Sequence, residues 1–162
     1  GTELGEKLRQ LLLHEKMVAL TENLLMFAAR CEHIQTIIKP KLDKGIIVVS
    51  DRFTDATYAY QAGGKGVDPQ SIDVLKHLIQ KDLEPDLTFL FDVPVEISME
   101  RLKDTRAMDK FEREAPSFHQ AIRTTYLELA QSHAKRFHVL DGTQSIPAIQ
   151  EEIKNTLDRL TL

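Results

Sequence analysis

The chain has 162 residues, of which 42% are hydrophobic and 28% charged, values that are ordinary for a single globular domain with its own hydrophobic core. Its 21 Lys and Arg against 25 Asp and Glu give a formal net charge of −4, which argues against broad binding to nucleic acid or to an anionic membrane, because both need a basic surface. The sequence contains no apolar run long enough to span a membrane and no signal-peptide pattern, and its lone Cys31 excludes a disulfide within the chain.

Two helices are predicted in the first part of the chain. Thr2 is a suitable N-cap for the first helix. The apolar stripe that we expect this helix to turn inward consists of Leu4, Leu8, Leu11 and Leu12. Arg9 lies off the stripe, so the pattern alone makes it a surface residue. The second helix should run from about Thr21 to Lys39, where Pro40 would end it.

The second helix is apolar on one side but contains a charge within its apolar stretch. Its inward positions are expected at Leu24, Phe27, Ala28, Cys31, Ile34, Ile37 and Ile38. Arg30 needs a partner there, because burying an unpaired charge is expensive. The pattern alone makes Met26 and Phe27 core residues and Cys31 a buried thiol.

A strand is predicted at residues 46–49. Ile46, Ile47, Val48 and Val49 are β-branched without polar alternation, which is typical of a strand covered on both faces at the centre of a parallel sheet. Asp51 and Arg52 would then lie beyond the carboxyl end of that strand, where open α/β sheets bind ligands. An ion pair at the edge of the sheet would explain the same two residues.

The stretch after Asp51 is rich in side-chain donors. Arg52 offers a forked and permanently charged donor set that suits a phosphate. Thr57, Tyr60 and Gln61 recur at three- and four-residue spacing, which would place them on one face of a helical turn. The amide of Gln61 suits the edge of a nucleobase. The glycines at 63, 64 and 66 lack the spacing of a phosphate-binding loop, and we expect a flexible turn there.

Helices and strands alternate in the rest of the chain. A helix capped by Asp68, with Leu75, Leu78 and Ile79 buried, is followed by a buried strand at 87–91 and a helix from Pro94. The next helix has Phe118, Ile122, Tyr126 and Leu129 on one face. A strand at 137–140 and a closing helix capped by Ser145 complete the prediction. Residues 101–114 are the densest run of charge, which by itself predicts a solvated surface. The six histidines include no pair at the helical spacing of metal ligands, so we expect no zinc site. The sequence also lacks the Gly-x-Ser-x-Gly motif of hydrolases.

The run Asp51-Arg52-Phe53-Thr54-Asp55-Ala56-Thr57-Tyr58-Ala59-Tyr60-Gln61 resembles the signature of bacterial thymidylate kinases. Residues 24–30 resemble the family's thymine-binding helix, residues 1–13 the segment after its first phosphate-contacting turn, and residues 85–92 a core strand. The resemblance implies an α/β fold of the P-loop nucleoside-monophosphate-kinase type, with a parallel sheet flanked by helices on both faces. Residues 1–162 would form one domain, without the family's N-terminal strand and Gly-rich loop, because no Gly-Lys-Ser/Thr sequence is present.

The resemblance also implies an activity and the residues of an acceptor site. The γ-phosphoryl group of ATP would be transferred to dTMP with Mg²⁺ (magnesium), which gives dTDP. The implied roles are Arg9 and Arg52 at the acceptor phosphate, Arg30, Thr57 and Gln61 at the base, Tyr60 against the deoxyribose, and Asp51 near the metal or orienting Arg52. The position of the family's base-stacking aromatic is Met26 here, with Phe27 beside it, and either residue could cover the ring.

Residues 103–114 resemble the family's lid over the donor nucleotide. The resemblance implies that Arg106 supplies catalytic positive charge with Lys103 and Lys110 behind it, that Asp109 and Glu112 are acidic lid positions, and that Thr143 and Gln144 lie near the adenine. We expect a homodimer through the long helices and a cytoplasmic location. Because the Gly-rich loop is absent from this sequence, we expect no kinase activity of the chain alone. A non-catalytic nucleotide-binding fragment and a kinase for another deoxynucleotide are the alternatives.

Overall fold

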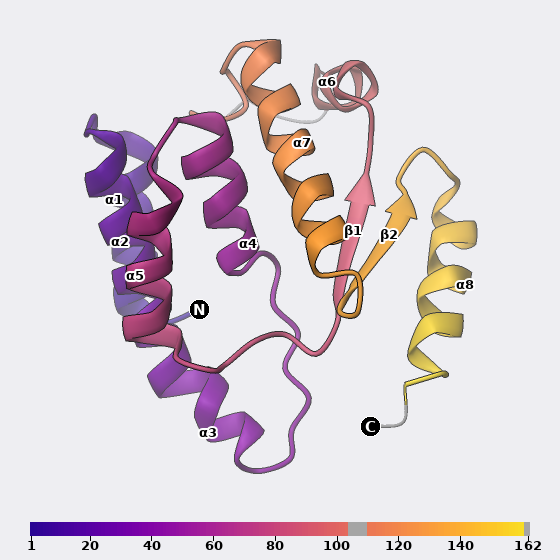
Figure 1. Ribbon diagram of the computed structural model, residues 1–162, viewed down its shortest axis with the longest axis horizontal. Helices are drawn as coiled ribbons and strands as arrows, with labels where there is room; N and C mark the ends of the chain where they lie inside the picture. The colour runs from indigo at the N-terminus through magenta and orange to yellow at the C-terminus, as the bar shows by residue number, and fades with distance from the viewer. Residues whose placement is uncertain (104–109, 161–162) are drawn as a thin grey trace. The chain divides into compact units, whose positions relative to one another are not determined.

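The computed structural model describes residues 1–103 and 110–160, which form two compact units (Figure 1). The helical unit comprises the described residues of 1–84 and 110–125, and the sheet unit those of 85–103 and 126–160. Helix α7 (Pro116–Ser132) contributes its first part to the helical unit and its last part to the sheet unit. No helix among the described residues combines the length and the apolar character needed to cross a bilayer.

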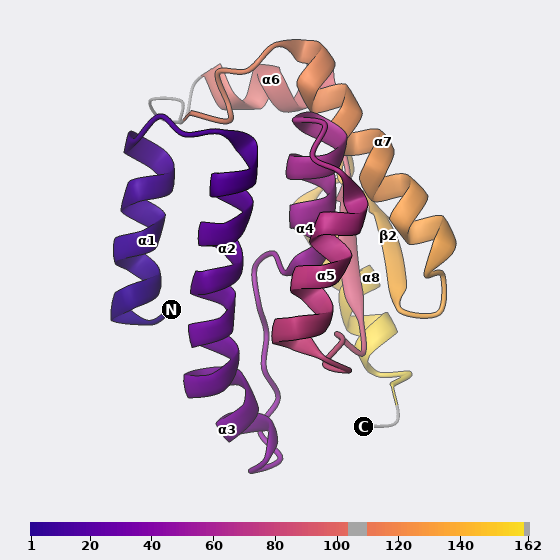
Figure 2. The same ribbon diagram turned by 60° about the vertical axis from the view of Figure 1, so that its left-hand side comes forward.

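The helical unit is built on α1 and α2, which lie side by side (Figure 2). Its elements before α7 are α1 (Glu3–His14), α2 (Ala19–His33), η1 (Ile34–Ile38), α3 (Lys39–Leu42), α4 (Thr54–Thr57), η2 (Tyr58–Gly64) and α5 (Pro69–Gln80). The predicted N-caps are confirmed, because the Thr2 hydroxyl accepts from the Gly5 amide at 2.9 Å and the Asp68 carboxylate from the Gln70 amide at 3.0 Å.

Several leucines predicted to face inward are exposed instead. In α1 only Leu12 is buried, while Leu4 and Leu11 are exposed, because α1 covers α2 with a single face. In α2 the buried residues include Phe27 but not Leu24 or Ala28. The core of the unit includes Phe27, Ile34, Ile38, Ala59 and Ile72, and Leu78 of α5 lies outside it. Cys31 is a free thiol that is half-buried rather than buried.

The prediction that Pro40 ends the second helix is wrong. The chain continues from α2 through η1, a π-helix with wider turns, into α3 without leaving helical backbone geometry. Pro40 lies in the first turn of α3, where the amide that proline lacks is least needed, so it is tolerated.

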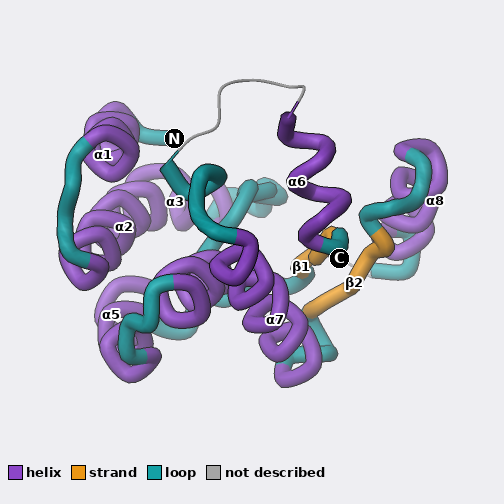
Figure 3. Tube along the Cα trace, turned by 90° about the horizontal axis from the view of Figure 1, so that it is seen from above, coloured by secondary structure: helices purple, strands orange, loops and turns teal. Residues whose placement is uncertain are grey.

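The predicted central strand at residues 46–49 is also wrong. The segment is extended but belongs to no sheet, and Ile47 and Val49 are 71% and 91% exposed. Figure 3, in which strands are orange, shows no strand in this part of the chain. An extended segment becomes a strand only when a neighbouring strand accepts and donates its backbone hydrogen bonds. Among the described residues, the one sheet consists of two other strands, and residues 46–49 form no ladder with either.

The sheet unit contains two parallel strands, β1 (Thr88–Asp92) and β2 (Phe137–Asp141), in agreement with the two strands predicted there. Leu140 of β2 is fully buried. Phe91 of β1 is exposed, so the prediction that this strand is buried is wrong at that residue. Two helices complete the unit, α6 (Val95–Lys103) and α8 (Ile146–Leu157), and Ser145 caps α8 as predicted. The described fold is therefore helical with a parallel sheet, which is α/β.

Candidate functional site

The signature stretch forms the short helix α4 and the π-helix η2. A π-helical turn is rare, and such turns often occur at functional sites. Two hydrogen bonds hold the stretch against α5, from Thr54 to Gln80 and from Tyr58 to Asp73. Thr57, Tyr60 and Gln61 thus stand on a helical backbone, as the spacing predicts.

Two of the three glycines that follow, Gly63 and Gly64, do not form the flexible turn that the sequence predicts. A Cβ atom on Gly63 would lie 2.1 Å from Oγ1 of Thr125, and one on Gly64 would lie 2.4 Å from Cε2 of Phe118. Both glycines therefore allow η2 to lie directly against the first part of α7. Of these three glycines, Gly66 alone has the positive φ, +69°, and the open surroundings of a turn glycine.

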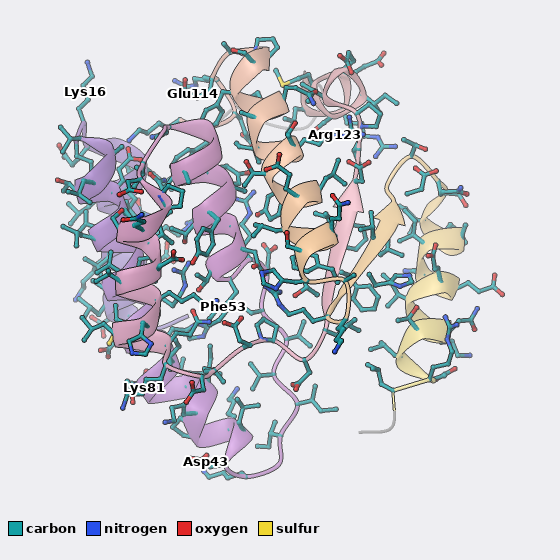
Figure 4. All side chains as sticks on the ribbon, viewed as in Figure 1. Lys16, Asp43, Phe53, Lys81, Glu114 and Arg123 are labelled. Atoms are coloured by element: carbon teal, nitrogen blue, oxygen red, sulfur yellow. The ribbon has the colours of Figure 1, made fainter. Side chains whose placement is uncertain are left out.

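Arg30 is held where α2 meets the start of α4. Its Nη2 donates to the Phe53 carbonyl at 3.2 Å and to the Thr57 hydroxyl at 2.9 Å, and its guanidinium lies 4.7 Å from the Phe27 ring centroid and 5.5 Å from that of Phe53. Phe53, labelled in Figure 4, lies on the segment that enters α4. Burial lowers the pKa of Arg30 to about 10 against the opposing effect of Asp55, so the group is charged at neutral pH. Its Nη1 is buried without a hydrogen-bond partner.

Gln61 offers an unmet acceptor in the same unit. Its side chain is 0% exposed, and its Nε2 approaches Sδ of the half-buried Met26 at 3.7 Å. Its Oε1 is buried with no partner. Arg30 and Gln61 together therefore present a buried donor and a buried acceptor that the described protein groups leave unused, and a ligand with the complementary pair would satisfy both.

Arg52 stands on strained backbone beside Tyr60. Its φ of 64° is in the left-handed region that a side chain other than glycine rarely adopts, a feature that clusters at functional sites. The Ser50 hydroxyl donates to its carbonyl at 3.0 Å, and its guanidinium lies 4.9 Å from the Tyr60 ring centroid. Asp51 and Arg52 are both exposed, so both remain accessible to a ligand.

Tyr60 is fixed by two further rings. Its centroid lies 5.8 Å from that of Phe111 and 6.3 Å from that of Phe118, both in edge-to-face geometry. The Tyr60 ring therefore forms a supported platform under the Arg52 guanidinium.

Sequence reasoning missed Glu22, which is 1% exposed and binds two lysines. Its Oε2 lies 2.6 Å from Nζ of Lys65 and its Oε1 lies 2.5 Å from Nζ of Lys110. Burial raises the pKa of Glu22, but the hydrogen bonds and charges of Lys110 and Lys65 outweigh it and the pKa is lowered. The lysines lie 43 and 88 residues away along the chain, so no local pattern indicates this cluster.

The remaining predicted site residues are placed as follows. Arg9 is exposed and pairs with Glu6 of its own helix at 3.1 Å. Glu112 is half-buried. Lys103 is the last residue of α6, and Arg106 and Asp109 lie outside the described residues.

Thr143 and Gln144 lie in the turn after β2. The Asp141 carboxylate accepts from the amide and hydroxyl of Thr143 at 2.9 and 2.6 Å and from Nε2 of Gln144 at 3.2 Å, and these bonds lower the pKa of Asp141. Gly142 packs so closely that a Cβ atom would lie 2.4 Å from Cγ2 of Val93, and its carbonyl accepts from Arg101 at 2.8 Å. The turn is thus fixed within the sheet unit.

The described residues contain no group of three or more His, Cys, Asp or Glu side chains that could hold a metal ion. Magnesium, however, is commonly held by one or two carboxylates together with substrate phosphates and water. The exposed carboxylate of Asp51 fits that requirement.

The family model described as thymidylate kinase matches residues 1–153. The chain belongs to the thymidylate kinase family. It is 54% identical over 153 residues to a thymidylate kinase of Methylobacillus flagellatus, covering 94% of this chain and 75% of that protein, and 53% identical over 154 residues to one of Janthinobacterium sp., covering 95% and 76%.

Solved structures agree with this assignment to the thymidylate kinase family. The crystal structure of thymidylate kinase from Ehrlichia chaffeensis matches with a TM-score of 0.77 at 33% identity, covering 98% of this chain and 75% of that one. The predicted fold class, an α/β P-loop nucleoside-monophosphate kinase, is confirmed, and so is the family suggested by the signature stretch.

Proposed function

We propose that this chain binds dTMP through its helical unit as the acceptor of the thymidylate kinase reaction, in which the γ-phosphoryl group of ATP is transferred to dTMP and gives dTDP. Membership of the family supports the reaction. The observation that supports the acceptor site is the buried donor of Arg30 and the buried acceptor of Gln61, both without partners. The thymine ring carries carbonyl acceptors and one N–H donor on its edge, which is the complementary pair.

The base would lie between α2 and η2. Arg30 would donate to a thymine carbonyl with Nη1, while Thr57 keeps the guanidinium in place through Nη2. Gln61 would accept from the ring N–H with Oε1. Met26, already next to Gln61, would cover the ring with its polarizable thioether, whereas Phe27 supports Arg30 from within the core.

Arg52 would bind the acceptor phosphate, with Arg9 as a second cation from α1. The guanidinium of Arg52 is exposed and stands on the Tyr60 ring, so a phosphate can reach it without breaking an ion pair that holds the fold. Tyr60 would pack against the deoxyribose. A ribose would add a 2′-hydroxyl at this contact, so we expect the deoxynucleotide to be preferred.

Asp51 would hold Mg²⁺ together with the nucleotide phosphates. When bound, the ion neutralises charge on the transferred phosphoryl group and its neighbours. The chain's own contribution is to orient the acceptor and to place cations around its phosphate, since phosphoryl transfer depends mainly on positioning and electrostatics. Lys103, Arg106, Asp109 and Glu112 remain predicted lid residues, and Thr143 and Gln144 remain predicted neighbours of the adenine.

A homodimer would cover the exposed apolar side chains of the long helices. Leu4, Leu11 and Leu24 are exposed on α1 and α2, and a partner chain packed on these helices would remove their side chains from water. A cytoplasmic location fits the single free cysteine, because disulfides are rare in that compartment.

The test is calorimetric titration of the chain with dTMP, dCMP and dUMP. We expect dTMP to bind and dCMP to bind at least about tenfold more weakly, since cytosine presents a donor where thymine presents an acceptor to Arg30. Equal affinity for dTMP and dCMP would contradict the assigned base contacts. Phosphoryl transfer is measured separately with ATP and magnesium, so that binding and catalysis are judged independently.

A further inference from the structure

Glu22 is paired with more positive charge than its carboxylate needs for neutralisation. A carboxylate with 1% exposure requires a partner, because an unpaired buried charge is strongly destabilising. Lys65 alone would neutralise it, with Nζ at 2.6 Å. Lys110 adds a second ammonium at 2.5 Å, although its side chain is 26% exposed and could reach water instead. The three groups therefore form a cluster with one excess positive charge.

The two lysines share a second neighbour, the ring of Phe111. Nζ of Lys65 lies 4.8 Å from the ring centroid and Nζ of Lys110 lies 5.8 Å from it, so both contribute cation–π attraction. Phe111 in turn contacts Tyr60 edge-to-face, and Tyr60 carries the Arg52 guanidinium. Direct contacts thus connect the Glu22 carboxylate on α2 with the exposed guanidinium of Arg52. They run through the two lysines, Phe111 and Tyr60.

Arg52 gains from such support. A long, exposed arginine samples many rotamers, and ordering it on a ligand costs side-chain entropy. A ring held in place from beneath restricts those rotamers before the ligand arrives, which is preorganisation.

We propose that Glu22 is a positioning residue for the acceptor phosphate, acting through Lys65, Lys110 and Phe111 on the Tyr60 platform and on Arg52. The assignment of Arg52 to the phosphate rests on the proposed function. Lys110, which the family resemblance groups with the catalytic cations, is then an anchor for Phe111, because its ammonium is already bound to Glu22.

The experiment is a double-mutant cycle on dTMP affinity, measured by calorimetry with Glu22→Gln, Arg52→Ala and the double variant. Glu22→Gln keeps the shape and removes the charge, and we expect dTMP affinity to fall about 3- to 30-fold. In the Arg52→Ala background the same change should have no further effect. Full additivity of the two changes would overturn the proposal, because Glu22 would then not act through Arg52.

The affinity for thymidine, which lacks the phosphate, distinguishes a role at the phosphate from a general structural role. A general structural role of Glu22 would change the affinity for thymidine as well as the affinity for dTMP. We expect its affinity to be unchanged in Glu22→Gln, and an equal loss for thymidine and dTMP would overturn the proposal. Glu3→Gln is the matched control, since Glu3 also binds a lysine, Lys7 at 2.7 Å, but is exposed on α1. It should leave both affinities unchanged.

A second variant covers the case in which Glu22→Gln does not fold. Lys110→Met removes one cation from the more exposed side of the cluster and leaves Glu22 paired with Lys65, and it should weaken dTMP binding in the same direction. Lys110→Arg should restore the affinity. A Lys110→Met variant with unchanged dTMP affinity would also overturn the proposal. If Arg52→Ala alone leaves dTMP affinity unchanged, the phosphate role of Arg52 in the proposed function is refuted. Additive effects of Glu22→Gln and Arg52→Ala would instead refute only the role proposed for Glu22.

Discussion

Replacing Gln61 by Met should stabilise the protein and weaken dTMP binding at the same time. The Gln61 side chain is 0% exposed, and its Oε1 has no hydrogen-bond partner. An unsatisfied buried polar atom costs about 1–3 kcal/mol, and an apolar side chain of similar length removes that cost. The Nε2 contact to Sδ of Met26, at 3.7 Å, is long and weak, so its loss subtracts little.

The expected gain is about 1–3 kcal/mol in the free energy of unfolding, or about 2–4 °C in Tm for each kcal/mol in a chain of this size. The expected loss in dTMP affinity is about 5- to 150-fold, because the same 1–3 kcal/mol of hydrogen bonding is missing from the complex. Thermal unfolding without nucleotide and calorimetric titration with dTMP measure the two effects separately.

Asn23→Leu is the matched control. Asn23 is 0% exposed and neither polar atom of its side chain has a partner, so leucine, which has the same branched shape, should also raise the Tm. Asn23 has no assigned contact with dTMP, and the affinity should not change. A Gln61→Met protein that is less stable than the parent, or that binds dTMP equally well, would refute the reasoning for Gln61.

Three further outcomes follow from other parts of the helical unit. Arg52→Ala should weaken dTMP binding by about tenfold or more, since a charge-assisted hydrogen bond contributes about 1.5–3 kcal/mol, and calorimetry that shows unchanged affinity would remove Arg52 from the acceptor site. Gly64→Ala should lower the free energy of unfolding by about 1–3 kcal/mol, because its Cβ would lie 2.4 Å from the Phe118 ring, and an unchanged Tm would show that the ring yields freely. The pKa of Glu22 is lowered in the folded protein, so its two lysine bonds stabilise the fold above its ordinary pKa of 4.5 and lose that effect as the pH falls through the lower folded value. The stability difference between the parent and Glu22→Gln, measured by denaturant unfolding, should therefore shrink below pH 4.5, and a difference that grows there would contradict the pairing.

Local signals in the sequence predicted three helix N-caps and two strands well. Thr2, Asp68 and Ser145 cap the helices they were expected to cap, because an N-cap depends on a side chain and an amide two or three residues away. The strands β1 and β2 were also predicted close to their observed bounds.

Non-local requirements account for the errors. The run Ile46–Val49 has the composition of a buried strand, but a strand needs a partner, and composition does not say whether one is adjacent. Leu24 has the spacing of a core residue, but whether a helix face is covered depends on which elements pack there. Glu22 was missed for the same reason, since Lys65 and Lys110 approach it from distant parts of the chain.

The signature residues were recognised by resemblance, yet the structure shows a physical property that no sequence pattern contains. Among the described residues, the buried side-chain atoms without a hydrogen-bond partner belong to Asn23, Arg30, Gln61 and His119. Folded proteins satisfy nearly all such atoms, so each unsatisfied one either weakens the fold or awaits a partner. Arg30 and Gln61 have complementary unmet groups, and the proposed function assigns both of them to the base, which favours a waiting ligand. Asn23 has no role in the proposed site, so its two unpaired atoms should only weaken the fold. The loss of dTMP affinity expected for Gln61→Met and the unchanged affinity expected for Asn23→Leu separate the two explanations.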